Sequence, residues 1–314
     1  MMLAMRLVGV LVTTAIAVGC NDLQVRAERD LTLHVPWDRF DALAVRSSNG
    51  GIDVSTGDGD VASISGTLAV GGATREEAEA RLARLDVSAA ADPAAPTRLL
   101  VEFRVPDDLR SANPSAKLVI KVPQAVPTDV QTTNGAIVVQ GMSGLVRLRT
   151  SNGSLTARGI DGPVNAQTSN GAVIVADTRG DVEAVTSNGR IEAVGVSGAC
   201  KAQTSNGAIT IRATGGGVRA VSSNGAINVD AEPAPDAPVT LKTSNAPISL
   251  TLPKALAGEL SLLTNNGTAR AALEGLRATV TTQSRKELRA TLNGGGPSRV
   301  SVESSNGSIN VEFR

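Results

Sequence analysis

Few residues in this chain are of the types that carry out chemistry. Among 314 residues there is one histidine, His34, and there are two cysteines, Cys20 and Cys200. A zinc site needs about four His, Cys or carboxylate ligands, and a histidine relay needs a nucleophile beside its base. His34 lies in an alternating segment, residues 31–35, which predicts a strand with His34 on its solvent side. We therefore expect no zinc centre, no histidine-based catalysis and no cofactor.

Two glycine-rich segments resemble ligand loops only in part. Residues 55–60, STGDGD, place Asp58 and Asp60 in a turn whose oxygens suit calcium. Calcium-binding β-rolls repeat such turns in tandem, and this one occurs once, so we favour an ordinary turn and keep both aspartates as weak metal candidates. The three glycines at 215–217 lack the Lys-Ser/Thr pair and the helix of a phosphate loop, which indicates a corner between strands.

The N-terminal residues predict export and lipidation. Arg6 precedes an apolar run over residues 7–18, which is too short to span a bilayer but has the length of a signal-peptide core. Residues 17–20 read AVGC, and small residues before a cysteine resemble a bacterial lipobox. We therefore expect a signal peptide over residues 1–19 and a lipid on Cys20 that anchors the protein in the cell envelope, facing the periplasm or the cell surface. An ordinary secretory signal and an uncleaved anchor stay open as alternatives.

The rest of the chain repeats with a period of 18 residues. Asparagines, nearly all followed by glycine, recur at this interval from Asn134 to Asn224, two intervals of 21 and one of 40 follow, and an earlier copy stands at Asn49. Five identical intervals in succession indicate one structural unit used repeatedly. We expect the following asparagines to lie at the corners of that repeat: Asn49, Asn134, Asn152, Asn170, Asn188, Asn206, Asn224, Asn245, Asn266 and Asn306.

Within each unit apolar residues alternate with polar ones, which predicts strands. The expected inward residues are Ile137, Val139, Val146, Leu148, Leu155, Ala157, Val164, Ala166, Val173, Val175, Val182, Ala184, Ile191, Ala193, Cys200, Ala202, Ile209, Ile211, Val218 and Ala220. A lipid on Cys20 would leave Cys200 without a disulfide partner. Cys200 is then either a reactive thiol or a small buried hydrophobe, and its place in the valine column favours the second.

Two folds use such strands. Antiparallel hairpins would put Asn-Gly in tight turns, but they need no fixed repeat length. In a parallel β-solenoid each coil lies about 4.8 Å from the last, so like residues stack in columns and the length is constrained. We therefore predict an all-β fold, a right-handed parallel β-helix with 18-residue coils, because parallel crossovers are right-handed and the hexad spacing of left-handed helices is absent. At the corners we expect glycine to supply a positive φ.

Outside the regular units the expected organisation is a tether and first strand over residues 20–45, followed by one solenoid domain over 46–314. Residues 46–66 would form a coil with Ile52, Val54 and Val61 facing inward. A helical insertion at about 67–98 contains Thr74 and Glu77 in a capping box, which predicts a short helix near residues 74–87 that covers a coil edge. Residues 89–96 predict a loop, and the interval 266–306 is long enough for two coils with an irregular corner at glycines 294–296.

These segments resemble a known family. The stretch KVPQAVPTDVQTTNGAIVVQG, the repeated TSNGAI-type units and the terminal SSNGSINVEFR are similar to the DUF4097 family, which is related to families called putative adhesins. The resemblance covers nearly the whole mature chain, most closely residues 117–314. It implies a β-helical envelope protein of unassigned biochemical role that is not an enzyme, and it offers no catalytic motif to carry over.

The charge pattern limits the classes of partner. Thirty basic and thirty acidic side chains give no net charge, and only 1% of residues are aromatic, which argues against nucleic acid. The outward columns, such as Thr156, Ile174, Glu192 and Thr210, hold no cluster of acids with a base. Arg147, Arg149 and Arg158 could form a small basic spot across two coils, but a single solvated cluster without a partner is the favoured interpretation.

We therefore expect a lipid-anchored, non-enzymatic protein of the cell envelope with a binding, adhesin-like or scaffolding role. Its expected partners are the membrane through the lipid, and another envelope protein, a glycan or a second copy. The alternative is a carbohydrate-active enzyme, a polysaccharide lyase or hydrolase, because those enzymes use the same scaffold.

Overall fold

The computed structural model describes residues 25–314, so Cys20 and the expected signal peptide lie outside the described residues. The chain divides into two compact units, Met1–Gly144 and Leu145–Arg314. Apart from one α-helix and one 3-10 helix, the regular structure of the described residues is all β-strand. Each unit contains two sheets, and we describe each unit by itself.

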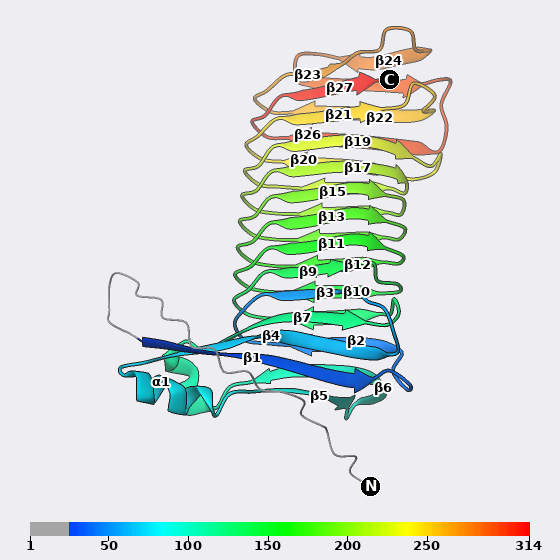
Figure 1. Ribbon diagram of the computed structural model, residues 1–314. Helices are drawn as coiled ribbons and strands as arrows, with labels where there is room; N and C mark the ends of the chain where they lie inside the picture. Colours follow the sequence, from blue (N-terminus) through cyan, green and yellow to red (C-terminus); the bar gives the residue numbers. More distant parts are fainter. Residues whose placement is uncertain (1–24) are drawn as a thin grey trace. The chain divides into compact units, whose positions relative to one another are not determined.

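In the second unit, short strands alternate between two sheets and stack on their counterparts from coil to coil (Figure 1). In spatial order the first sheet contains β11 (Leu155–Ile160), β13 (Val173–Thr178), β15 (Ile191–Val196), β17 (Ile209–Gly215), β19 (Ile227–Pro233), β21 (Ile248–Leu252), β27 (Ile309–Phe313) and β23 (Ala269–Ala271). The second contains β10 (Val146–Arg149), β12 (Val164–Gln167), β14 (Val182–Val185), β16 (Cys200–Gln203), β18 (Val218–Val221), β20 (Val239–Thr243), β26 (Ser298–Ser304), β22 (Gly258–Thr264), β25 (Glu287–Leu292) and β24 (Ala278–Gln283).

The pairing between coils is parallel and keeps like residues in register. Val146 faces Val164 across β10 and β12, and Ile191 faces Ile209 across β15 and β17, so register partners in these coils are 18 residues apart. Every residue of the regular 18-residue units that was predicted to face inward is buried, including Cys200, which is 1% exposed. The predicted all-β parallel β-helix is confirmed.

The end of the second unit differs from the expected pair of further coils. Strand β26 pairs in parallel with both β20 and β22, and β27 lies between β21 and β23. The last coil in sequence is therefore an inner layer of the unit. Residues 278–292 form two antiparallel strands, β24 and β25, and β25 pairs antiparallel with β22. The expectation of two successive coils over residues 266–306 is wrong, because this segment turns back on itself.

The first unit also has two sheets. One contains, in spatial order, β1 (Val25–Pro36), β4 (Val61–Gly72), β7 (Ser115–Val122), β3 (Ile52–Thr56) and β9 (Ile137–Gln140), and the other contains β8 (Thr128–Gln131), β2 (Ala42–Arg46), β6 (Ala95–Arg104) and β5 (Asp86–Asp92). The coil formed by β2 and β3 thus lies between the β8–β9 coil and the β6–β7 segment. Strands β1, β4 and β7 pair antiparallel, as do β5 and β6.

Three local expectations in this unit can be compared with the structure. Val61 is 36% exposed, and Ala62 and Ile64 are buried in its place, because the turn at 57–60 shifts the two-residue alternation by one position. Residues 89–96, expected as a loop, belong to the β5–β6 hairpin, whose turn holds only Pro93 and Ala94. The expected strand around His34 is confirmed, and His34 is exposed.

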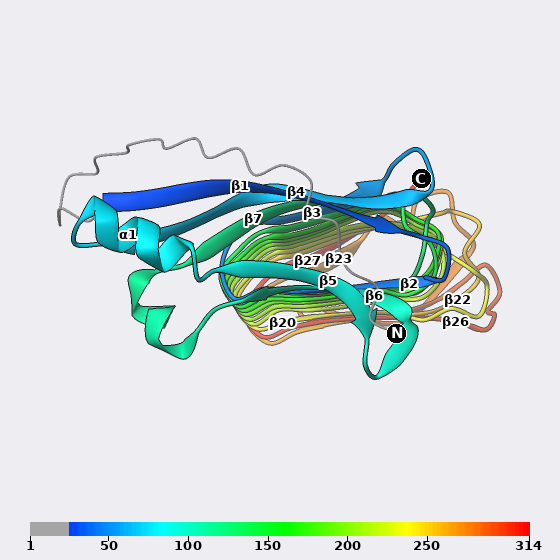
Figure 2. The same cartoon turned by 60° about the horizontal axis from the view of Figure 1, so that its bottom comes forward.

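The predicted helix is present as α1 (Arg75–Leu82). Thr74 caps it: the Glu77 N–H donates to Thr74 Oγ1 at 3.2 Å, and the Glu77 carboxylate accepts from the Ala73 N–H at 2.7 Å. Its buried residues are Ala78 and Leu82, and the helix packs against β1 and β4 (Figure 2). A 3-10 helix, η1 (Asp107–Ala112), lies between β6 and β7.

Candidate functional site

Most corners that lead into the strands of the first sheet share one repeated hydrogen-bond pattern. In the second unit, the N–H groups of Ser187 and Asn188 both donate to the carbonyl oxygen of Ser169, at 3.1 and 3.0 Å. The same two-donor contact recurs in four other corners. The accepting carbonyl oxygens are those of Ser151, Ser187, Ser205 and Ser223, and the donors are the Ser and Asn N–H groups of the following coil. Each of these corners therefore presents two convergent N–H donors to a single oxygen of the preceding coil, whereas at Asn306 and Asn266 the two donors bind two different oxygens.

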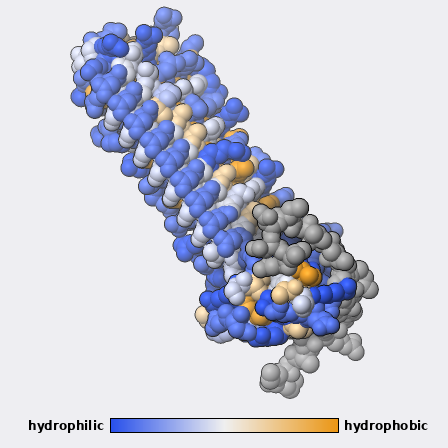
Figure 3. All heavy atoms as spheres, turned by 90° about the vertical axis from the view of Figure 1, so that its left-hand side faces the viewer, coloured by the Kyte–Doolittle hydropathy of each residue, from blue (hydrophilic) through white to orange (hydrophobic). Residues whose placement is uncertain are grey.

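The asparagine side chains form a ladder on the outside of these corners. Each Nδ2 donates to the Oδ1 of the neighbouring asparagine, as from Asn188 to Asn170 at 2.7 Å. In spatial order the ladder contains Asn152, Asn170, Asn188, Asn206, Asn224, Asn245, Asn306 and Asn266. Figure 3 shows rows of hydrophilic side chains repeating along the side of Figure 1 where these turns lie. Stacked amides of this kind satisfy one another and hold the register of the coils.

Glycine is needed at these corners for a reason other than the one expected. Only Gly50 among the Asn-Gly corners has a positive φ, of 111°. At Gly171, Gly189 and Gly207 a Cβ atom would overlap the carbonyl oxygen of the glycine one coil before. The expectation of a positive φ is therefore wrong for the regular corners, and the close approach of two backbones requires glycine there.

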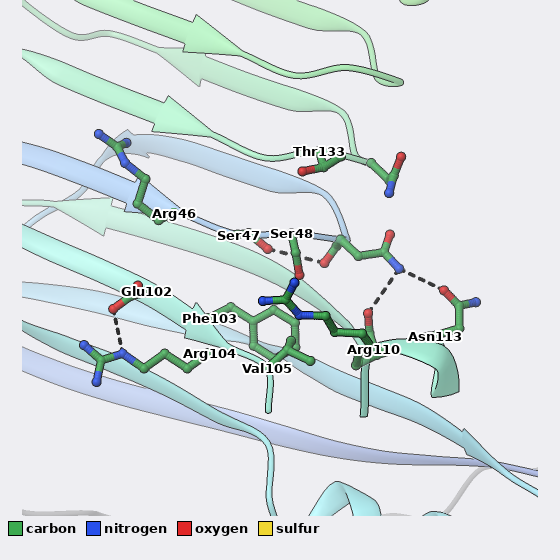
Figure 4. Close-up of a pocket in the computed structure, with 13 residues that line it drawn as sticks. Arg46, Ser47, Ser48, Glu102, Phe103, Arg104, Val105, Arg110, Asn113 and Thr133 are labelled. Atoms are coloured by element: carbon green, nitrogen blue, oxygen red, sulfur yellow. Dashed lines mark hydrogen bonds and ion pairs between the residues drawn. The ribbon is translucent and has the colours of Figure 1, made fainter. Parts of the chain in front are cut away.

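The first corner of the first unit, residues 47–50, borders an open groove (Figure 4). The groove has a volume of about 740 Å³. Strands β2 and β6, the corner, and the segment after β6 supply its walls. The lining residues are Arg46, Ser47, Ser48, Asn49, Glu102, Phe103, Arg104, Val105, Arg110, Asn113, Pro114, Thr133 and Asn134.

The charged side chains of the groove are held in ion pairs of unequal strength. Arg46 binds the Asp129 carboxylate at 2.7 Å and the Asp129 carbonyl oxygen at 3.0 Å, which fixes its guanidinium. Arg104 pairs with Glu102 at 2.6 Å. Arg110 contacts Asp107 at 2.8 Å, but their side chains are 74% and 90% exposed, so this pair contributes little. The groove is thus rich in donors, and Arg104 and Arg110, whose side chains are 71% and 74% exposed, are the cations most easily turned towards a ligand.

The residues singled out from the sequence lie elsewhere. Asp58 and Asp60 are exposed in the turn between β3 and β4, and across residues 25–314 no group of three or more His, Cys, Asp or Glu side chains is placed to hold a metal ion. Arg147 lies in one sheet and Arg158 in the other, so they do not form the basic spot that was weighed. Burial raises the pKa of Cys200 to about 12, which keeps its thiol protonated at neutral pH.

Sequence reasoning missed the groove, although a signal for it exists. A regular corner has five residues, as between β12 and β13, whereas ten residues, 105–114, separate β6 from β7. The longer segment contains η1 and lines the groove beside the first corner. An irregular linker between two strands was therefore the only indication of the site in the sequence.

Fold and groove together define a parallel β-helix protein with an open polar groove. The model of the Toastrack DUF4097 family matches residues 102–312, and the chain belongs to this family. No curated protein matches the sequence. None of the helices in residues 25–314 is long and apolar enough to span a membrane.

Three solved structures are similar in outline. A putative cell adhesion protein from Clostridium sporogenes is 10% identical, with 91% of this chain and 100% of that chain covered and a TM-score of 0.24. A putative adhesin from Bacteroides fragilis is 12% identical, with 91% and 97% covered and a TM-score of 0.41. A putative adhesin from Parabacteroides merdae is 10% identical, with 90% and 95% covered and a TM-score of 0.28.

Proposed function

We propose that this chain is a lipid-anchored, non-enzymatic binding protein of the bacterial cell envelope with an adhesin-like role. The observation that carries the proposal is the groove of the first unit, where Arg46 is held by Asp129 beside an open, donor-rich surface. Groups fixed in ion pairs recognise a ligand by shape and charge, and they do not need to exchange protons with it. Membership of the Toastrack DUF4097 family supports a β-helical envelope role, and the lipobox-like ending at Cys20 supports the anchor.

The anchor is tested with two matched cysteine variants. Cys20→Ser should move the protein from the detergent-soluble membrane fraction to the aqueous fraction, because one acyl-bearing residue supplies the attachment. Cys200→Ser should leave the distribution unchanged, since Cys200 is buried in the second unit. Unchanged membrane association of the Cys20→Ser protein would contradict lipid anchoring.

Binding is tested on isolated cell envelopes and on a panel of envelope polysaccharides. We expect saturable binding by the purified full-length protein that weakens in Arg110→Glu, which reverses the charge in the groove. Arg179→Glu is the control, because Arg179 lies in the second unit and its side chain is 80% exposed. Each polysaccharide is also assayed for new reducing ends and unsaturated products, with and without calcium. Sustained product release would establish the carbohydrate-active enzyme instead.

A further inference from the structure

We propose that the groove of the first unit binds the carboxylate group of an acidic glycan. One carboxylate oxygen accepts from the backbone N–H groups of Ser48 and Asn49, and the other accepts from the guanidinium of Arg110. This assignment rests on the proposed binding function and names the ligand class of the same site.

The first argument is a pair of backbone donors that has no protein acceptor. Ser48 and Asn49 occupy the positions that Ser187 and Asn188 occupy in a regular corner. In the regular corner both N–H groups bind one serine oxygen of the preceding coil, at 3.1 and 3.0 Å. Within residues 25–314, neither the Ser48 nor the Asn49 N–H donates to any protein atom. The first corner therefore has the two-donor geometry of the repeat without its oxygen.

The second argument is the position of these donors beside the groove. The segment beside the first corner is 105–114, which replaces a five-residue corner by ten residues and the 3-10 helix η1. Asn113 and Pro114 accept the Asn49 side-chain amide at 3.0 and 3.1 Å, so they continue the asparagine ladder. They do not bind the main-chain N–H groups. Ser48 and Asn49 both line the groove that this segment borders, so an acceptor in the groove lies beside the two donors.

The charge of the groove favours a single negative charge. Arg110 reaches across it in the direction of Ser48, and its contact to the highly exposed Asp107 is easily exchanged (Figure 4). Arg46 is already held by Asp129, and Glu102 places a negative charge at the rim. A carboxylate has one oxygen for the paired N–H groups and one for the guanidinium, and such charge-assisted contacts are stronger than neutral ones. A doubly charged phosphate would meet more repulsion from Glu102.

The remaining lining selects a sugar over a peptide. Hydroxyl and amide side chains dominate the surface near the two donors, namely Ser47, Ser48, Asn49, Asn113, Thr133 and Asn134. These groups both donate and accept, as sugar hydroxyls do. The one aromatic residue of the groove, Phe103, is 5% exposed, so it offers no open pocket for an apolar peptide anchor. The volume of about 740 Å³ is that of a small-ligand cleft.

The main-chain contact is tested by amide resonances in the full-length protein. Titration with a galacturonate trisaccharide should shift the N–H signals of Ser48 and Asn49, because both gain an acceptor. The signals of Ser187 and Asn188 serve as the control, since both already bind Ser169. Saturable binding without movement of the Ser48 and Asn49 signals would overturn the carboxylate site and leave the binding function standing.

Calorimetry then tests the ligand class and the role of Arg110. The acidic trisaccharide should bind at least about tenfold more tightly than neutral galactotriose, an acidic tripeptide or inorganic phosphate, and Arg110→Gln should lose about tenfold. Arg179→Gln should bind as the unchanged protein does. Equal affinity for the neutral sugar, or tighter binding of the peptide or phosphate, would overturn the assignment. Absence of saturable binding of the unchanged protein to whole envelopes would contradict the proposed function itself.

Discussion

Single inward residues of the second unit carry its stability. Ile209 is 0% exposed and lies between Ile191 and Ile227 in register. Ile209→Asp buries a carboxylate with no cation beside it, which costs several kcal/mol against a whole-domain stability of about 5–15 kcal/mol. Thr210→Asp, on the neighbouring outward position, should cost much less, because its carboxylate stays in contact with solvent and is repelled only by the neighbouring Glu192. Thermal unfolding measures both, and equal shifts in Tm would show that the inward columns do not dominate stability.

Cys200 should be chemically silent until the protein unfolds. Burial raises its pKa from 9.0 to about 12, so the reactive thiolate is almost absent at pH 8. We expect Ellman's reagent to label it only in guanidinium chloride, whereas a Ser197→Cys variant, at an exposed position, should be labelled at once. The stability linked to the protonated thiol is complete below pH 9.0 and is lost as the pH rises towards 12. Rapid labelling of Cys200 in the folded protein would contradict this environment.

Among the elements, the corners are the least tolerant of added volume. A Cβ on Gly207 would overlap the Gly189 carbonyl oxygen, whereas a Cβ on Gly51 meets nothing nearer than the Ala136 oxygen at 3.7 Å. Gly207→Ala should therefore destabilise the protein by roughly 1–3 kcal/mol, the cost of overpacking. Gly51→Ala should be neutral or slightly stabilising, because it restricts the unfolded chain. Denaturant midpoints of the two variants decide this, and similar midpoints would mean that the coils can separate freely.

At the scale of the molecule, each unit places a coil between two segments that are not its neighbours in sequence. In the second unit, β26 and β27 separate the β20–β21 coil from the β22–β23 coil. Ending the chain at residue 297 removes this inner layer, so residues 258–297 should become sensitive to protease. In a solenoid whose coils stack in sequence order, the same truncation would remove only the terminal coil, and residues 258–297 would stay resistant to protease.

The control for this truncation removes an outer layer. Replacing residues 272–296 by a short Gly-Ser linker deletes β24 and β25, which lie at the edge of their sheet, and keeps every parallel pair. This variant should stay resistant to protease and keep most of its Tm. If the truncated and the linker proteins behave alike, the inserted last coil is not what holds β22 and β23.

The sequence by itself determined the repeat and the faces of its strands. Period-two alternation and 18-residue recurrence place Ile191, Cys200 and Ile209 in the core, because a strand has only two faces and a stacked coil has only one register that aligns them. The capping residues Thr74 and Glu77 likewise predicted where α1 begins. These features depend on local spacing, which the sequence contains in full.

Only the tertiary structure decided the order of the end coils and the groove. The corner at Asn306 has the same motif as the other corners, so by sequence it could stack equally well on the corner of Asn245 or on that of Asn266. In the structure it lies between the two. The groove arises because residues 105–114 do not follow the path of a regular corner. They leave the main-chain N–H groups of Ser48 and Asn49 without the serine oxygen that a regular corner binds. Repeated motifs make many pairings nearly equal in local energy, so long-range packing at the ends of each unit selects one of them.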